Sequence, residues 1–131
     1  MRGETVLLVE DNPRNLKLAR DVLEFAGFAV TVATTGEAAL REANRNLPDL
    51  VLLDLQLPGI SGHTVLARLR EDPRTAGIPV VALTAFAMPA DREHALAAGF
   101  DGYLGKPISV REFPAQVRAH LLAGRSGGRG V

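Results

Sequence analysis

The chain has no cysteine, which excludes disulfides, thiolate nucleophiles and metal sites built on cysteine ligands. It has no net charge, because 15 Lys and Arg balance 15 Asp and Glu, and no basic run, so direct nucleic-acid binding is not expected. No apolar stretch approaches the roughly 20 residues needed to span a bilayer, and no charged-then-apolar signal segment opens the chain. These absences predict a soluble, cytoplasmic protein that does not enter a membrane.

The 131 residues suit one domain with a full hydrophobic core. We expect this domain to cover residues 1–123. Residues 124–131 are rich in Gly and Arg and lack apolar anchors, so we expect them to form a flexible tail.

Five short apolar runs alternate with five segments of helical periodicity. A short apolar run between turn signals is typical of a strand buried on both faces of a parallel sheet. Right-handed connections through helices then favour a flavodoxin-like (βα)5 doubly wound parallel sheet with strand order 2-1-3-4-5. The expected strands are Thr5–Val9, Phe28–Ala33, Leu50–Leu53, Val80–Leu83 and Asp101–Leu104.

The helices between these strands have recognisable ends. Asn12-Pro13 is a favourable start for the first helix, and Gly27 is a favourable stop. The fourth helix is expected over about Pro89–Ala98. The last is expected to begin at Ser109, with Glu112 completing a capping box.

Polar side chains follow four of the five predicted strands. Asp54 ends the central strand, and the turn Pro58-Gly59 comes soon after it. Because the carboxyl ends of parallel strands meet at one edge of a sheet, these side chains should lie close together. The others are Glu10 and Asp11 after the first strand, Thr84 after the fourth and Lys106 after the fifth.

This set of groups suits one kind of chemistry. Three carboxylates packed together resist ionisation without a cation, and an all-oxygen site suits Mg²⁺, with Mn²⁺ as a possible substitute. Lys106 could pair with Asp54 or with an anion attached to it, and Thr84 could donate a hydrogen bond to that anion. The combination favours capture of a phosphoryl group on Asp54.

The chain resembles the response-regulator receiver domains of two-component signalling, within the CheY-like superfamily. The resemblance covers residues from about 5 to 122 and depends on the order and spacing of four short segments. These are Val9-Glu10-Asp11-Asn12, Leu53-Asp54-Leu55-Gln56-Leu57-Pro58-Gly59, Leu83-Thr84-Ala85 and Tyr103-Leu104-Gly105-Lys106-Pro107. Within the family the chain is similar to stand-alone cell-cycle regulators of the DivK type and to the receivers of hybrid kinases.

The resemblance implies a role for each matching residue. Asp54 would accept a phosphoryl group from the phosphohistidine of a partner, either a histidine kinase or a histidine phosphotransferase. The carboxylates of Glu10, Asp11 and Asp54 and the backbone carbonyl of Gln56 would hold Mg²⁺. Thr84 and Lys106 would contact the phosphoryl group. The Lys106-Pro107 peptide would be cis.

The resemblance also implies a switch rather than an enzyme with an independent substrate. Thr84 would move toward the phosphoryl group, and Tyr103 would turn inward with it. This would change the surface of the helix Pro89–Ala98, the strand Asp101–Leu104 and the last helix, through which a downstream protein is contacted. Gln56 and Phe86 flank the site and are expected to tune hydrolysis of the acyl phosphate.

Three other functions are compatible with parts of this pattern. A haloacid dehalogenase-type phosphatase would need a second Asp where Gln56 stands, since Gln cannot transfer a proton. A nucleotide- or flavin-binding module would need a phosphate-binding loop where Glu10-Asp11 would repel phosphate. A receiver that binds proteins without being phosphorylated remains open.

Several other side chains have ordinary structural interpretations. The three histidines His63, His94 and His120 are expected to lie far apart, at the surface or in packing positions, and outside the site. Phe86 and Met88 suit either the core or a partner surface. The remaining expectation is a solvated helix face formed by Arg68, Arg70 and Arg74.

Overall fold

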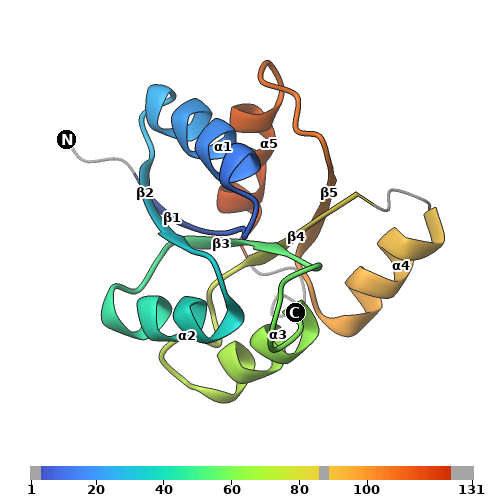
Figure 1. The fold of residues 1–131 in the computed structure, drawn as a ribbon. Coiled ribbons are helices and arrows are strands. Elements are labelled where there is room, and N and C mark those ends of the chain that lie inside the picture. The colour runs from blue at the N-terminus through green and yellow to red at the C-terminus, as the bar shows by residue number, and fades with distance from the viewer. Residues whose placement is uncertain (1–3, 86–88, 125–131) are drawn as a thin grey trace.

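The computed structural model describes residues 4–85 and 89–124, and these form a five-stranded parallel sheet covered by helices on both faces (Figure 1). The strand order is β2-β1-β3-β4-β5, so the predicted doubly wound flavodoxin-like topology is confirmed. The elements in chain order are β1 (Thr5–Val9), α1 (Pro13–Phe25), β2 (Ala29–Ala33), α2 (Gly36–Arg45), β3 (Leu50–Asp54), α3 (Gly62–Glu71), β4 (Val80–Thr84), α4 (Pro89–Ala98), β5 (Gly102–Gly105) and α5 (Phe113–Ala123).

The central strand β3 is buried along its whole length, as its apolar run predicts. Successive strand residues point to opposite faces of a sheet. Leu50 and Leu52 therefore pack under α1 and α5, while Val51 and Leu53 pack against the helices of the other face. Figure 1 shows α1 and α5 together on one face of the sheet and α2 and α3 on the other. These two cores hold the end of β3, and with it Asp54, in the middle of one sheet edge.

The start of α5 differs from the prediction. The helix begins at Phe113, four residues after Ser109, and Glu112 makes no side-chain capping bond. Ser109 instead caps a preceding turn, where its Oγ accepts the Glu112 N–H at 3.3 Å. Pro114 explains the difference: in a helix beginning after Ser109 its missing N–H would fall in the interior, whereas at the first turn of α5 it costs no helical bond.

Arg70 is the exception to the predicted solvated face of α3. Arg68 is exposed on α3, and Arg74 is exposed but lies beyond the end of this helix at Glu71, whereas the Arg70 Nη2 donates to the buried Asp101 Oδ2 at 2.6 Å. Arg70 Nη1 also donates to the Ile78 carbonyl at 2.7 Å. Asp101 Oδ2 in turn accepts the Val80 N–H at 2.8 Å, so this ion pair joins α3 to the start of β4 and to the segment before β5.

His120 is a packing residue, as expected, and lies against Gly102 of β5. A Cβ on Gly102 would collide with the His120 ring. Burial lowers the pKa of His120, and the nearby Arg92 adds to this effect, while Asp101 opposes it. The neutral imidazole is therefore the form that the folded state favours.

Stability should consequently fall on mild acidification, partly through His120. The unfolded chain takes up a proton near the usual histidine pKa, and the folded chain does so only at lower pH, so the stabilisation present above that value is lost as pH falls. Urea unfolding between about pH 7.5 and about pH 5.5 should show a steeper loss for the unaltered protein than for His120→Gln. Parallel curves for the two proteins would contradict this role.

Within the described part of the chain, no helix has both the length and the apolar character that crossing a bilayer requires. The predicted tail, residues 124–131, lies outside the described residues except for Gly124, which ends α5.

Candidate functional site

Three carboxylates meet at the carboxyl edge of the sheet, where β1 and β3 are neighbours. One oxygen each from Glu10, Asp11 and Asp54 lies within 4.8 Å of the others. Glu10 and Asp54 are only 2% and 1% exposed, whereas Asp11 is exposed. They line a cleft of ≈ 570 Å³ together with Gln56 and Lys106, among others. Glu10, Asp11, Asp54 and Lys106 therefore converge as the strand ends predict, whereas Thr84 is not among the residues that line this cleft.

Local hydrogen bonds fix the first part of this cleft. Asn12 caps α1, because its Oδ1 accepts the N–H groups of Arg14 at 3.0 Å and Asn15 at 3.1 Å. The Asn12 N–H donates to Glu10 Oε2 at 3.1 Å. The helix cap thus orients the buried Glu10 carboxylate.

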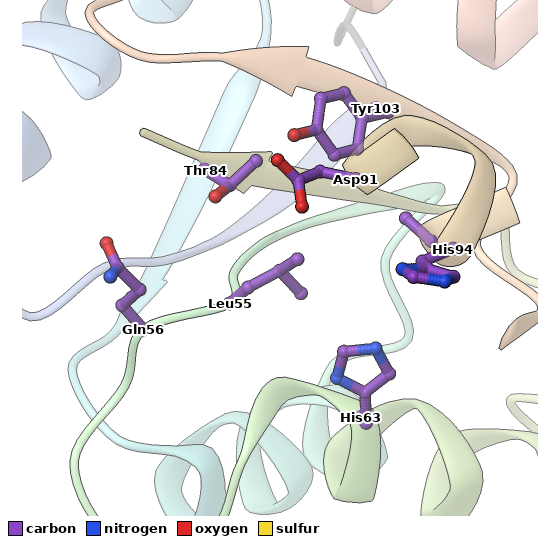
Figure 2. Close-up of a pocket in the computed structure, with 8 residues that line it drawn as sticks. Leu55, Gln56, His63, Thr84, Asp91, His94 and Tyr103 are labelled. Atoms are coloured by element: carbon purple, nitrogen blue, oxygen red, sulfur yellow. The ribbon is translucent and has the colours of Figure 1, made fainter. Parts of the chain in front are cut away.

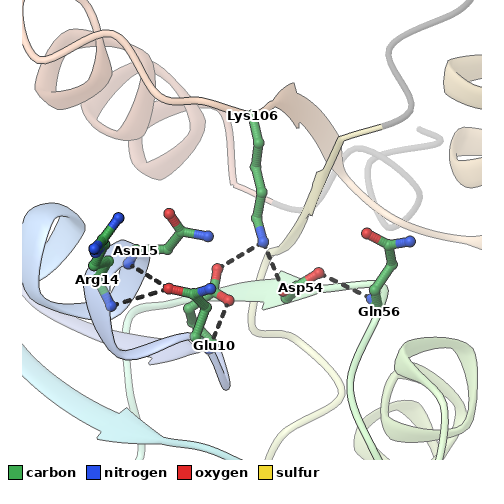
Figure 3. Close-up of polar contacts among 7 residues, drawn as sticks. Glu10, Arg14, Asn15, Asp54, Gln56 and Lys106 are labelled. Atoms are coloured by element: carbon green, nitrogen blue, oxygen red, sulfur yellow. Dashed lines mark hydrogen bonds and ion pairs between the residues drawn. The ribbon is translucent and has the colours of Figure 1, made fainter.

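Asp54 is held from the other side by its own loop. Its Oδ1 accepts the Gln56 N–H at 2.9 Å, and its Oδ2 faces Lys106 (Figure 3). An aspartate that bonds the backbone two residues ahead is a common turn arrangement. Here it leaves the second carboxylate oxygen directed into the cleft.

Lys106 joins the two buried carboxylates. Its Nζ lies 2.7 Å from Asp54 Oδ2 and 2.8 Å from Glu10 Oε1 (Figure 3). Its side chain is 16% exposed, so these ion pairs are largely shielded from water. The peptide bond between Lys106 and Pro107 is cis, as the family resemblance implied.

Burial and charge shift the acid–base behaviour of this cluster. Burial raises the pKa of Glu10, and the Asp54 charge adds to it, although Lys106 and the Asn12 N–H act in the opposite direction. Burial alone would lower the pKa of Lys106, but its bonds to Asp54 and Glu10 raise that pKa above its usual range. Lys106 is therefore a permanent cation at neutral pH.

The donor set fits a hard divalent cation. Three carboxylates, which offer oxygen ligands, come together after β1 and at the end of β3, and the Lys106 ammonium contacts two of them. The exposed Asp11 lies on the open side of the cluster, where a metal ion could keep water ligands. The carboxylates could thus bind a metal.

Thr84 and Tyr103 line an adjoining cavity of ≈ 430 Å³, which also includes Gln56 and Asp91 (Figure 2). Thr84 is 2% exposed, and its carbonyl accepts the Lys106 N–H at 2.8 Å. Burial raises the pKa of Tyr103, and the Asp91 charge adds to it, while the Thr84 hydroxyl opposes it. Gln56 lines both hollows and so links the carboxylate cleft to this second cavity.

Two of the three histidines belong to this cavity, which corrects the expectation that all three lie apart. Figure 2 shows His63 of α3 and His94 of α4 at one end of the cavity and Gln56 at the other. His63 also packs edge-on against Phe100, with ring centroids 5.4 Å apart. The sequence pattern does not indicate that His63 and His94 line one cavity, because this depends on how α3 and α4 are placed over the sheet.

Two residues singled out in the sequence, Phe86 and Met88, lie outside the described residues. The other predicted site residues are all described. The geometry brings Glu10, Asp11, Asp54 and Lys106 together, and it places Thr84 and Tyr103 in the adjoining cavity.

Known protein sequences are similar to this chain across most of its length. The response regulator receiver domain family matches residues 6–118. The polar-differentiation response regulators DivK of Brucella ovis and Brucella abortus are 42% identical over 118 residues, which are 90% of this chain and 96% of those proteins.

Solved structures show the same similarity. A putative response regulator from Chloroflexus aurantiacus is 35% identical, with a TM-score of 0.86 over 92% of this chain and 99% of that one. The receiver domain of a sensor histidine kinase from Pseudomonas aeruginosa is 36% identical, with a TM-score of 0.79 over 92% and 96%. That structure has a magnesium ion coordinated in its active-site cleft. With this fold and a family match across most of its length, the chain belongs to the response regulator receiver domain family.

Proposed function

We propose that this protein is a Mg²⁺-dependent phosphoacceptor in a phosphorelay, with Asp54 as the residue that is phosphorylated. Asp54 Oδ2 contacts Lys106 Nζ at 2.7 Å inside a cluster of three carboxylates, and this contact is the main support for the proposal. A nucleophilic carboxylate, a fixed cation and a set of metal ligands are the parts that phosphoryl transfer needs.

In the transfer, an Asp54 carboxylate oxygen attacks phosphorus. An O–P bond forms, and the bond from phosphorus to the leaving group breaks, so that the leaving group departs with the electron pair. Lys106 stabilises the negative charge on the transferring oxygens, and the Thr84 hydroxyl donates to one of them. The carboxylates of Glu10 and Asp11 would hold Mg²⁺ together with Asp54 and the Gln56 carbonyl. When bound, the ion supplies charge neutralisation for the incoming phosphoryl group.

The phosphoryl group would come from a phosphohistidine on another protein, a histidine kinase or a histidine phosphotransferase. The chain then acts as a switch that takes part in its own phosphorylation and dephosphorylation, rather than as an enzyme with a separate substrate. The similarity to DivK and to a kinase receiver domain supports this assignment.

The cavity lined by Thr84 and Tyr103 would transmit phosphorylation of Asp54 to the protein surface. Movement of Thr84 toward a phosphoryl group on Asp54 changes the packing available to Tyr103, which lines the same cavity. Tyr103 lies in β5, between α4 and α5, so these elements form the surface that a downstream protein would read.

Intact mass after incubation with Mg²⁺ and acetyl phosphate tests the proposal. We expect the mass of one phosphoryl group to be added to the unaltered protein, and none to be added after chelation of Mg²⁺ or in Asp54→Asn. Asp21→Asn, an exposed carboxylate on α1, is the matched control and should be phosphorylated normally. No adduct on the unaltered protein would leave a receiver that binds proteins without phosphorylation.

A further inference from the structure

Asn15 is a polar residue of the cleft that the proposed transfer does not use. It lies in the first turn of α1 and lines the cleft together with Glu10, Asp54 and Lys106. Figure 3 shows it on the α1 side of Lys106, while Gln56 lies beyond Asp54 on the opposite side. Two side-chain amides therefore flank the ion-paired carboxylates.

The side chain of Asn15 does not cap α1. The Oδ1 of Asn12 already accepts the N–H groups of Arg14 and Asn15, so the helix start is satisfied without a second asparagine. Among residues 4–85 and 89–124, the Asn15 amide has no hydrogen-bond partner, and the residue is exposed. Asparagine also forms helices less readily than alanine, so local stability does not account for it.

Asn15 lies on the other side of Lys106 from the Asp54 carboxylate that would be phosphorylated. The Lys106 ammonium bridges Glu10 and Asp54, and Figure 3 places it between Asn15 and Asp54. With the transferring oxygens at Lys106, the Asn15 amide on the other side of the ammonium is placed to reach the part of a donor that extends beyond them. An amide can donate to such a group without adding charge to the cluster.

We propose that Asn15 binds the leaving group of the phosphodonor, an inference that depends on the proposed phosphorylation of Asp54. With acetyl phosphate, the Asp54–phosphorus bond forms, the bond between phosphorus and the acetate oxygen breaks, and acetate leaves with the electron pair. The Asn15 amide donates a hydrogen bond to this departing carboxylate. Once acetate has left, Asn15 has no contact with the phosphoryl group.

The rate of phosphorylation and the rate of decay of the phosphorylated protein test this role separately. In Asn15→Ala, the second-order rate of phosphorylation by acetyl phosphate with saturating Mg²⁺ should fall about 5-fold, the effect of one ordinary hydrogen bond. The decay of phosphorylated protein after removal of the donor should be unchanged. Asn15→Gln, which keeps the amide, should recover part of the rate. Asn44→Ala, an asparagine on α2 outside the cleft, should behave as the unaltered protein does.

Other outcomes would contradict the role. A phosphorylation rate unchanged in Asn15→Ala would show that the amide does not contact the donor. An equal fall in phosphorylation and decay would place Asn15 on the phosphoryl group instead. Absence of any adduct on the unaltered protein would contradict the proposed function itself, and with it this role of Asn15.

Discussion

Replacing Lys106 by methionine is expected to slow phosphorylation of Asp54 by acetyl phosphate about 100-fold or more. The Lys106 Nζ is within 2.8 Å of both buried carboxylates, and its raised pKa keeps it charged at neutral pH. Removing a fixed donor from a shielded site costs far more than removing one from water. Methionine keeps the apolar stem, which lines a small hollow of ≈ 30 Å³ beside α1.

The same substitution should strengthen Mg²⁺ binding, because the ammonium no longer competes for the oxygens of Asp54 and Glu10. Phosphorylation rates by intact mass and Mg²⁺ titration by calorimetry measure the two effects separately. Lys17→Met, an exposed lysine on α1, is the matched control and should leave both unchanged. A Lys106→Met rate within threefold of the unaltered rate, roughly the effect of a weak surface pair, would remove Lys106 from the mechanism.

Replacing Arg70 by methionine is expected to lower the free energy of unfolding by about 3 to 5 kcal/mol. Asp101 is almost fully buried, and its Oδ2 depends on the Arg70 guanidinium at 2.6 Å. Loss of Arg70 would leave that buried carboxylate without its guanidinium partner and would remove the bond to the Ile78 carbonyl. For a domain of ordinary stability this is a large fraction of the total.

Urea unfolding of a double-mutant cycle measures this interaction. Arg70→Met with Asp101→Asn should lose less than the sum of the two single changes, because the amide is neutral and still accepts the Val80 N–H. Arg68→Met, exposed on the same helix, should change stability little. Strict additivity of Arg70 and Asp101 would show that the ion pair contributes nothing.

Much of the fold is encoded in local pattern. The apolar run of β3 and the helix signals at Asn12-Pro13 are sufficient to predict those elements, because burial on both faces and helix capping depend on neighbours in the chain. The start of α5 was misplaced by the same local reasoning. There, the Ser109 capping signal competed with Pro114, and the position of the proline decided where the helix begins.

The residues that form the carboxylate site are also predictable from the sequence. A parallel sheet brings its strand ends to one edge, so the order of the strands is enough to bring Glu10 and Asp54 together with Lys106. The pattern of strands and helices thus predicts the topology and brings Glu10, Asp11, Asp54 and Lys106 into one cleft.

Packing of the whole fold determines which side chains come together away from the strand ends. Arg70 and Asp101 are 31 positions apart, and His63 and His94 come from different helices, so no local period relates them. The position of Asn15 beside Lys106 likewise depends on how α1 lies next to the end of β5. Helical periodicity shows which face of a helix is buried, but the rotation and offset of one helix over the sheet come from packing of the whole core.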